Sequence, residues 1–295
     1  MNKRETEMMR EEMPGAGGKI SCGRDSSGRT NRVWRLLITL CAMVFVGSSA
    51  AFFHTLWQGN QEKKTFAQLA EIADGGNDTK NKEVIQADNG GEKTEEEKDA
   101  SRLLKYQELS SMNPDFAGWL KIDGTMVDYP VMYTPEDIQY YIRRDFYGKD
   151  SVSGTPFIGD SCDADSPSVI IYGHNMKNGS MFGSLDRYAE KSYWEEHKEL
   201  QFDTPEEVRR YEVFAAFRTR LLNDGEEGFR YYEYVGNLGK EAFDDFVREA
   251  AAASAYDTGI VPEYGDQLVI LSTCSYHTAN GRFVVAARRL PEEHK

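Results

Sequence analysis

Short apolar runs separated by turn residues dominate the chain from Phe116 onward. Two of them, 169–171 and 268–271, are continuous apolar runs, which is typical of fully buried strands. Asp123-Gly124 is a tight-turn dipeptide between two other runs. The expected strands are 118–122, 126–132, 155–158, 168–172, 208–217, 267–272 and 282–288. Seven or eight short strands predict a mostly β domain, either a barrel or a sandwich.

Helical periodicity interrupts this pattern. Apolar residues recur in pairs every four positions at Ala242, Phe243, Phe246, Val247, Ala250 and Ala251. This spacing predicts a helix with one apolar face that ends near 257–259. The more charged segment 180–199 is expected to be a surface helix between strands. A short helix is also predicted at 101–111, before Asn113-Pro114.

Residues 36–53 contain no charge, and a helix of this length nearly spans a hydrocarbon core. Trp34 and Trp57 lie where interfacial aromatic residues are expected. We therefore expect a single transmembrane helix over 36–57. The alternative is a cleaved signal peptide, although secretory apolar regions are usually shorter.

The charges around this segment predict its orientation. Residues 1–35 carry eight Lys/Arg against five Asp/Glu, and four arginines lie close to the apolar segment. The positive-inside rule places this end in the cytoplasm. The expected organisation is a cytoplasmic N-terminus (1–35), an anchor (36–57), an extracellular stalk (58–100) and a folded domain (101–295).

The stalk is expected because residues 74–99 contain almost no apolar side chains, although Phe66, Leu69, Ala70 and Ala73 before them recur at helical spacing. The formal net charge of −14 argues against a nucleic-acid partner. The five histidines are dispersed and no C-x-x-C occurs, so neither a metal nor another cofactor is predicted.

Three polar motifs lie at the ends of predicted buried strands, around His174, Cys274 and Arg282. A cysteine becomes a nucleophile when an imidazole takes its proton, and a guanidinium can stabilise the oxyanion formed on a carbonyl. If strands 267–273 and 282–288 pair as a hairpin, Arg282 lies beside Cys274. These three residue types suffice for acyl transfer.

Other residues compete for these roles. His277 is close enough to Cys274 to be its base, whereas His197 has acidic neighbours and is predicted to be solvated. Arg288 and Arg289 compete with Arg282. A disulfide between Cys162 and Cys274 is a further alternative, which would exclude catalysis by Cys274. The tail histidine, His294, is not expected to take part.

Thr273-Cys274 at the end of an apolar strand, Arg282 eight residues later and Gly173-His174-Asn175 upstream resemble the signature of the sortase family. The stretch 113–120, followed by Asp128-Tyr129-Pro130-Val131, is similar to the opening of class B catalytic domains. Together these motifs cover the chain from about residue 100 to 290.

The resemblance implies an eight-stranded sortase-type β-barrel with an N-terminal helix and a second helix, 238–253, between strands six and seven. It implies a cysteine transpeptidase that cuts surface proteins after the Thr of a C-terminal sorting motif and passes them to an amine of a peptidoglycan precursor. Cys274 is then the nucleophile, His174 the acid and base, and Arg282 the oxyanion stabiliser. Ser272 and Thr273 are expected to line the substrate groove. No acidic residue is assigned to orient His174.

Several rival functions remain as alternatives. An L,D-transpeptidase would need His and Arg where Ser272 and Tyr276 stand, and a papain-like fold would need a more distant His after Cys274. An anchored β-domain that only binds a ligand or wall polymer is the alternative outside enzymes. Within sortases, class A and pilus-building class C members are the alternatives to class B.

Overall fold

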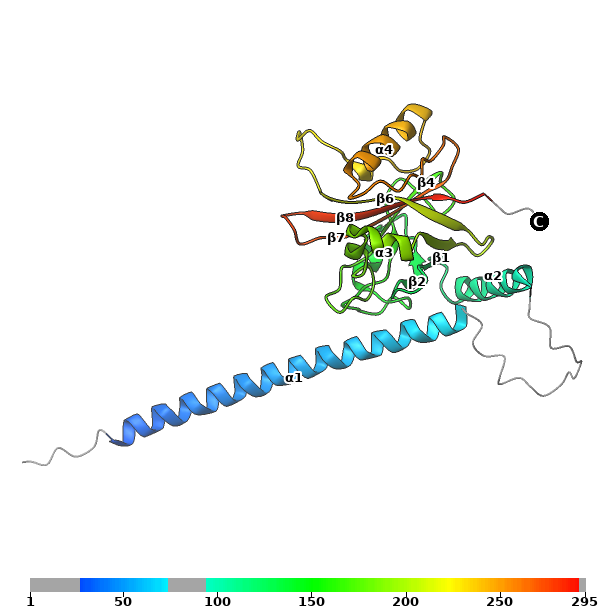
Figure 1. Ribbon diagram of the computed structural model, residues 1–295. Coiled ribbons are helices and arrows are strands. Elements are labelled where there is room, and N and C mark those ends of the chain that lie inside the picture. The colour runs from blue at the N-terminus through cyan, green and yellow to red at the C-terminus, as the bar shows by residue number, and fades with distance from the viewer. Residues whose placement is uncertain (1–26, 74–93, 292–295) are drawn as a thin grey trace, which may run out of the picture. The chain divides into compact units, whose positions relative to one another are not determined.

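The computed structural model describes residues 27–73 and 94–291. The chain forms two compact units, Met1–His54 and Thr55–Lys295, and the long helix α1 (Ser27–Ala73) passes through the boundary between them. All of the strands belong to the second unit, in which they are surrounded by short helices (Figure 1).

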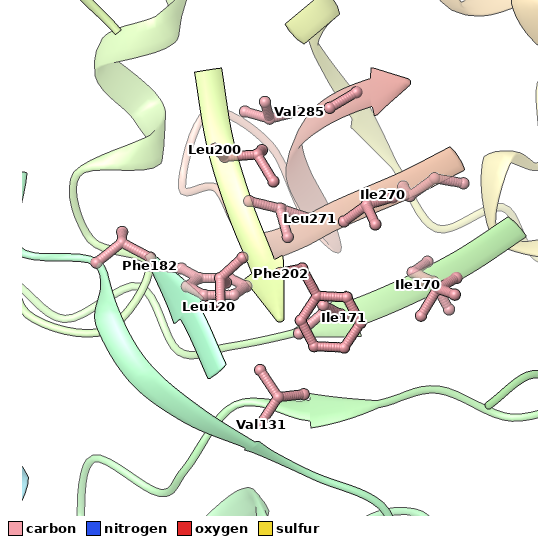
Figure 2. Packing of buried hydrophobic residues seen from close by; sticks show 14 of the residues in the cluster. Leu120, Val131, Ile170, Ile171, Phe182, Leu200, Phe202, Ile270, Leu271 and Val285 are labelled. Atoms are coloured by element: carbon pink, nitrogen blue, oxygen red, sulfur yellow. The ribbon is translucent and has the colours of Figure 1, made fainter. Parts of the chain in front are cut away.

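The strands close into a barrel in the order β1-β2-β3-β4-β7-β8-β6-β5. Their bounds are β1 (Phe116–Lys121), β2 (Asp128–Met132), β3 (Phe157–Ile158), β4 (Ser168–Tyr172), β5 (Glu199–Asp203), β6 (Arg210–Arg220), β7 (Leu268–Cys274) and β8 (Gly281–Arg289). The predicted eight-stranded barrel is thereby confirmed. Its interior is filled by apolar side chains from opposite sides of the barrel, as Figure 2 shows for Val131, Ile171, Leu200, Phe202 and Leu271.

The prediction of a surface helix over 180–199 is wrong for most of this segment. The structure has only a 3-10 turn, η2 (Leu185–Ala189), and a short helix, α3 (Lys191–Glu196), before β5 begins. The strand β5 pairs with both β1 and β6, and it buries Leu200 and Phe202. This alternation of buried and outward residues is typical of a strand, but the polar positions around it resemble those of a surface helix.

The predicted helix between strands six and seven is confirmed as α4 (Lys240–Ala253). It buries the side chains of Phe243, Phe246 and Ala250, which form one face at helical spacing. Phe246 packs edge-on against Phe214 of β6, at 6.3 Å between ring centroids. The helix therefore covers the outside of the barrel wall at β6.

The helix predicted at 101–111 begins earlier, as α2 (Glu95–Met112). Thr94 and Glu97 form a capping box, in which each side chain accepts a hydrogen bond from the other residue's main chain. The helix is attached to the barrel by Tyr106, whose hydroxyl donates to the buried Asp203 carboxylate at 3.0 Å. The cap lies within the acidic segment that we assigned to the stalk.

The expected anchor segment lies within α1, but a membrane span is not confirmed. No helix within residues 27–73 and 94–291 is long and apolar enough to cross a membrane. The side chains of residues 51 and 54–56 lie outside the described residues, as do residues 1–26 of the predicted cytoplasmic segment and 74–93 of the predicted stalk. The last turns of α1 bury Phe66, Leu69 and Ala73 in the core of the second unit.

Candidate active site

Parallel pairing of β4 with β7 brings His174 and Cys274 to the same end of the barrel. Tyr172 lies opposite Ser272 in this ladder, so His174 and Cys274 each lie two residues beyond a matched pair. The Gly173 amide extends the contact by donating to the Ser272 carbonyl at 3.2 Å. A hundred residues separate the two candidates along the chain, and the shared register of the two strands brings them to the same place.

Arg282 reaches the same place through the hairpin of β7 and β8. The antiparallel register sets Cys274 opposite Arg282, as the sequence predicted. At the tip of the hairpin, the Ser275 amide donates to the Gly281 carbonyl at 2.9 Å. A Cβ at Gly281 would lie 2.2 Å from the Ser275 carbonyl oxygen, so this close approach requires glycine.

These side chains line a groove of about 340 Å³ at the end of the barrel. All five residues predicted for the site are in its wall. The complete lining is Ile138, Gln139, Ile142, Thr155, Phe157, Asp160, Tyr172, Gly173, His174, Leu221, Ser272, Thr273, Cys274 and Arg282. An apolar wall with a few convergent polar groups is the usual form of a ligand site.

The ring of His174 is held by a main-chain group. Its Nε2 lies 2.8 Å from the carbonyl oxygen of Ile142, in the 3-10 turn η1 (Tyr140–Arg143). Burial lowers the pKa of His174, and the nearby Arg143 guanidinium lowers it further, against the opposing effect of the Ile142 hydrogen bond. The sequence offered no signal for this contact, because Ile142 acts through its backbone.

The hydroxyls of Ser272 and Thr273 are engaged by the protein itself. Thr273 Oγ1 donates to the Gly173 carbonyl at 2.7 Å, and Ser272 Oγ lies 2.8 Å from the hydroxyl of Tyr231, in η3 (Tyr231–Glu233). Both residues are almost fully buried. They line the groove, but their hydroxyls join the ends of β4, β7 and η3.

Asn175 is a site residue whose role the sequence analysis missed. Its Nδ2 donates to the Cys274 carbonyl at 2.8 Å and to Asp186 Oδ2 at 3.1 Å. The side chain thus ties the residue after His174 to the main chain of Cys274. The sequence feature that could have identified Asn175 is its position next to His174.

The competing residues lie elsewhere. His277 Nδ1 is 3.0 Å from the Ser275 hydroxyl, and His277 is not in the groove wall. His197, predicted to be solvated, bonds through Nδ1 to the Asp123 carbonyl at 2.9 Å. Arg288 pairs with Glu212 and Asp266, Arg289 pairs with Glu207, and His294 lies outside the described residues.

The disulfide alternative does not occur. Cys162 and Cys274 are both free thiols. Cys162 is buried, with its sulfur 3.7 Å from the Gly159 carbonyl oxygen, and burial raises the pKa of its thiol to about 11. Cys274 is partly exposed in the groove. The two thiols therefore differ in access to reagents.

Comparisons with known proteins identify the family to which the chain is similar. The sortase domain family matches residues 120–290, more than half of the chain. Sortase B of Listeria monocytogenes is 27% identical over 188 residues, which cover 62% of this chain and 73% of the relative. Sortase B of Staphylococcus aureus is 26% identical over 188 residues, covering 62% and 74%.

Among solved structures, sortase B from Bacillus anthracis in complex with AAEK1 superposes with a TM-score of 0.59 at 26% identity. The match covers 80% of this chain and all of that one. The barrel topology, the inserted helix and the family match agree, and the chain belongs to the sortase family of cysteine transpeptidases.

Proposed function

We propose that this chain is a class B sorting enzyme of the cell wall. It cleaves secreted surface proteins after the Thr of a C-terminal sorting motif and transfers them to an amine of a peptidoglycan precursor. The observation that supports this proposal best is the single groove that holds Cys274, His174 and Arg282. The assignment to class B is supported by α4 between β6 and β7 and by the sortase B relatives.

In the first half-reaction, Cys274 Sγ attacks the Thr carbonyl carbon, and the thiol proton passes to His174. Arg282 stabilises the oxyanion of the tetrahedral intermediate. His174 then returns its proton to the leaving amine as the C–N bond breaks. The acyl group remains on Cys274 as a thioester.

In the second half-reaction, the acceptor amine attacks the thioester carbon and His174 takes its proton. The Cys274 sulfur leaves as a thiolate and a new amide bond is formed, and the thiolate then takes the proton from His174, which restores the thiol and the neutral ring. The lowered pKa of His174 supports this sequence, because it favours a neutral ring that accepts a proton before it donates one.

The membrane-held, extracellular location remains a prediction within this proposal. It is supported by large apolar side chains that α1 exposes at Leu36, Ile38, Phe45, Phe52 and Phe53. Exposed apolar surface of this extent marks a binding or membrane-contact surface. Recovery of the full chain in membranes of a Gram-positive host, with its C-terminal unit open to external protease, tests the location.

Quenched fluorescent peptides test the proposed activity. The full chain is tested on motifs of the Asn-Pro-Gln-Thr-Asn and Leu-Pro-x-Thr-Gly types, beside Cys274→Ala, His174→Ala and Arg282→Ala. We expect cleavage after Thr by the wild type and its loss in all three variants. The matched controls Cys162→Ala and His277→Ala should still cleave.

Cleavage that survives Cys274→Ala would refute the assignment of the nucleophile. Inactivity on every peptide, together with a Cys274 thiol that reagents do not label, would favour the ligand-binding alternative. A preference for the Leu-Pro-x-Thr-Gly type would instead favour class A or a pilus-building enzyme.

A further inference from the structure

A buried carboxylate on α1 holds a loop of the barrel unit. Glu62 is 7% exposed, and it accepts hydrogen bonds from the Val152 amide at 2.8 Å, the Ser153 amide at 3.4 Å and the Ser153 hydroxyl at 2.7 Å. A carboxylate taken out of water is costly unless donors surround it. These donors make Glu62 the attachment point between α1 and the loop 151–154.

The loop 151–154 is packed tightly on η1. The Ser151 amide donates to the Arg143 carbonyl at 2.9 Å, and Arg143 Nη1 donates to the Val152 carbonyl at 2.9 Å. Gly154 has a φ of +61°, and a Cβ there would lie 2.5 Å from the Ile142 carbonyl oxygen. At Gly154 the loop therefore lies directly against the Ile142 peptide.

The Ile142 carbonyl is also the group that binds His174, at 2.8 Å from Nε2. A carbonyl only accepts, so Nε2 carries the proton of the neutral ring and Nδ1 holds the lone pair. The position of this carbonyl thus determines both the orientation of the imidazole and the nitrogen that can act as a base.

We propose that Glu62 is a positioning residue for acyl transfer: through the loop 151–154 it holds the Ile142 carbonyl in place, and with it the ring of His174. This inference rests on the proposed role of His174 as acid and base. Through Glu62, α1 then helps to hold the active-site histidine in place.

Several charged or titratable groups lie around the His174 ring. Arg143 approaches from η1, and Asp160, Tyr172, Cys274 and Arg282 line the same groove from the barrel strands and the loop after β3. The Ile142 hydrogen bond raises the pKa of His174, whereas burial and Arg143 lower it. Loss of the Ile142 contact should therefore lower this pKa further.

The test compares full-length Glu62→Ala, Glu62→Gln and a control on the same helix, Glu71→Ala, whose side chain is exposed. We expect kcat for peptide cleavage to fall about tenfold in Glu62→Ala, because a small displacement of the His174 ring slows proton transfer. KM should stay within about twofold of the wild-type value. Glutamine retains an acceptor for the Val152 amide and should restore most of kcat.

The second measurement is an NMR titration of the His174 ring, assigned with His174→Gln. Its midpoint should be lower in Glu62→Ala than in the wild type and unchanged in Glu71→Ala. A loss of thermal stability with an unaltered titration and kcat would overturn the proposal, because Glu62 would then be merely structural. If the wild type cleaves no peptide, the proposed function fails, while the titration still decides the role of Glu62.

Discussion

Replacement of Thr273 by valine separates a structural role of this residue from a role in substrate binding. Valine keeps the branched shape of threonine and replaces its hydroxyl with a methyl group. The residue is 2% exposed, and its hydroxyl donates to the Gly173 carbonyl at 2.7 Å. The variant therefore leaves this carbonyl without its partner, between the strands that carry His174 and Cys274.

The size of the effect follows from this geometry. A carbonyl that loses its partner costs about 1–3 kcal/mol when it is buried and less when, like that of Gly173, it is part-buried, and the higher β-propensity of valine offsets a few tenths of this. We expect the free energy of unfolding to fall by about 1–2 kcal/mol. For a domain of this size, that corresponds to a decrease in Tm of about 2–8 °C.

Urea unfolding followed by tryptophan fluorescence measures this change, with the exposed Thr278→Val as the matched control. Peptide cleavage is measured on the same samples. Wild-type stability in Thr273→Val, combined with a raised KM, would refute the reasoning, because the hydroxyl would then bind substrate instead of joining the strands.

Three further predictions concern α1, the thiols and the histidine. Leu69→Ala on α1 removes a fully buried side chain and should cost about 2–5 kcal/mol, measured by urea unfolding. Thiol reagents should label Cys274 in the folded protein, and Cys162 only after unfolding, because Cys162 is buried and its pKa is raised to about 11. The NMR titration midpoint of His174 should lie below the ordinary 6.5, since burial disfavours the charged ring. Its contribution to stability is then complete above pH 6.5 and declines as the pH falls toward the folded-state pKa.

Each of these predictions has a result that contradicts it. A change below about 0.5 kcal/mol in Leu69→Ala would mean that α1 does not pack on the barrel. Equal labelling rates for the two cysteines would contradict the burial of Cys162. A midpoint above 6.5 for His174 would mean that a hydrogen-bond acceptor has a larger effect on its pKa than burial.

The tip of β7 and β8 shows what could be predicted from local sequence. The apolar run before Cys274 and the short connection to Arg282 predict a hairpin, and the structure has these two residues opposite each other. The paired apolar residues of α4 likewise predict its buried face. In both cases the information lies within about one element's length, where spacing and geometry are directly related.

The strand β5 and the start of α2 show the limit of this reasoning. Leu200 and Phe202 face the core only because β1 and β6, distant in sequence, supply the pairing partners. The cap at Thr94 lies in a segment so polar that its composition predicts a solvated stalk.

By itself, the sequence determined the types of the chemical groups, the local strands and helices, and the neighbourhood of Cys274 and Arg282. The resemblance named His174 as their partner, but only the tertiary structure brings it to the same groove, because parallel pairing of β4 with β7 is a contact between residues a hundred positions apart. The same holds for the contact of His174 with the Ile142 carbonyl and for that of the Glu62 carboxylate with the Val152 amide, because folding brings a side chain to a distant backbone group. A main-chain carbonyl or amide is present at nearly every residue, so its role has no signature in the order of the side chains.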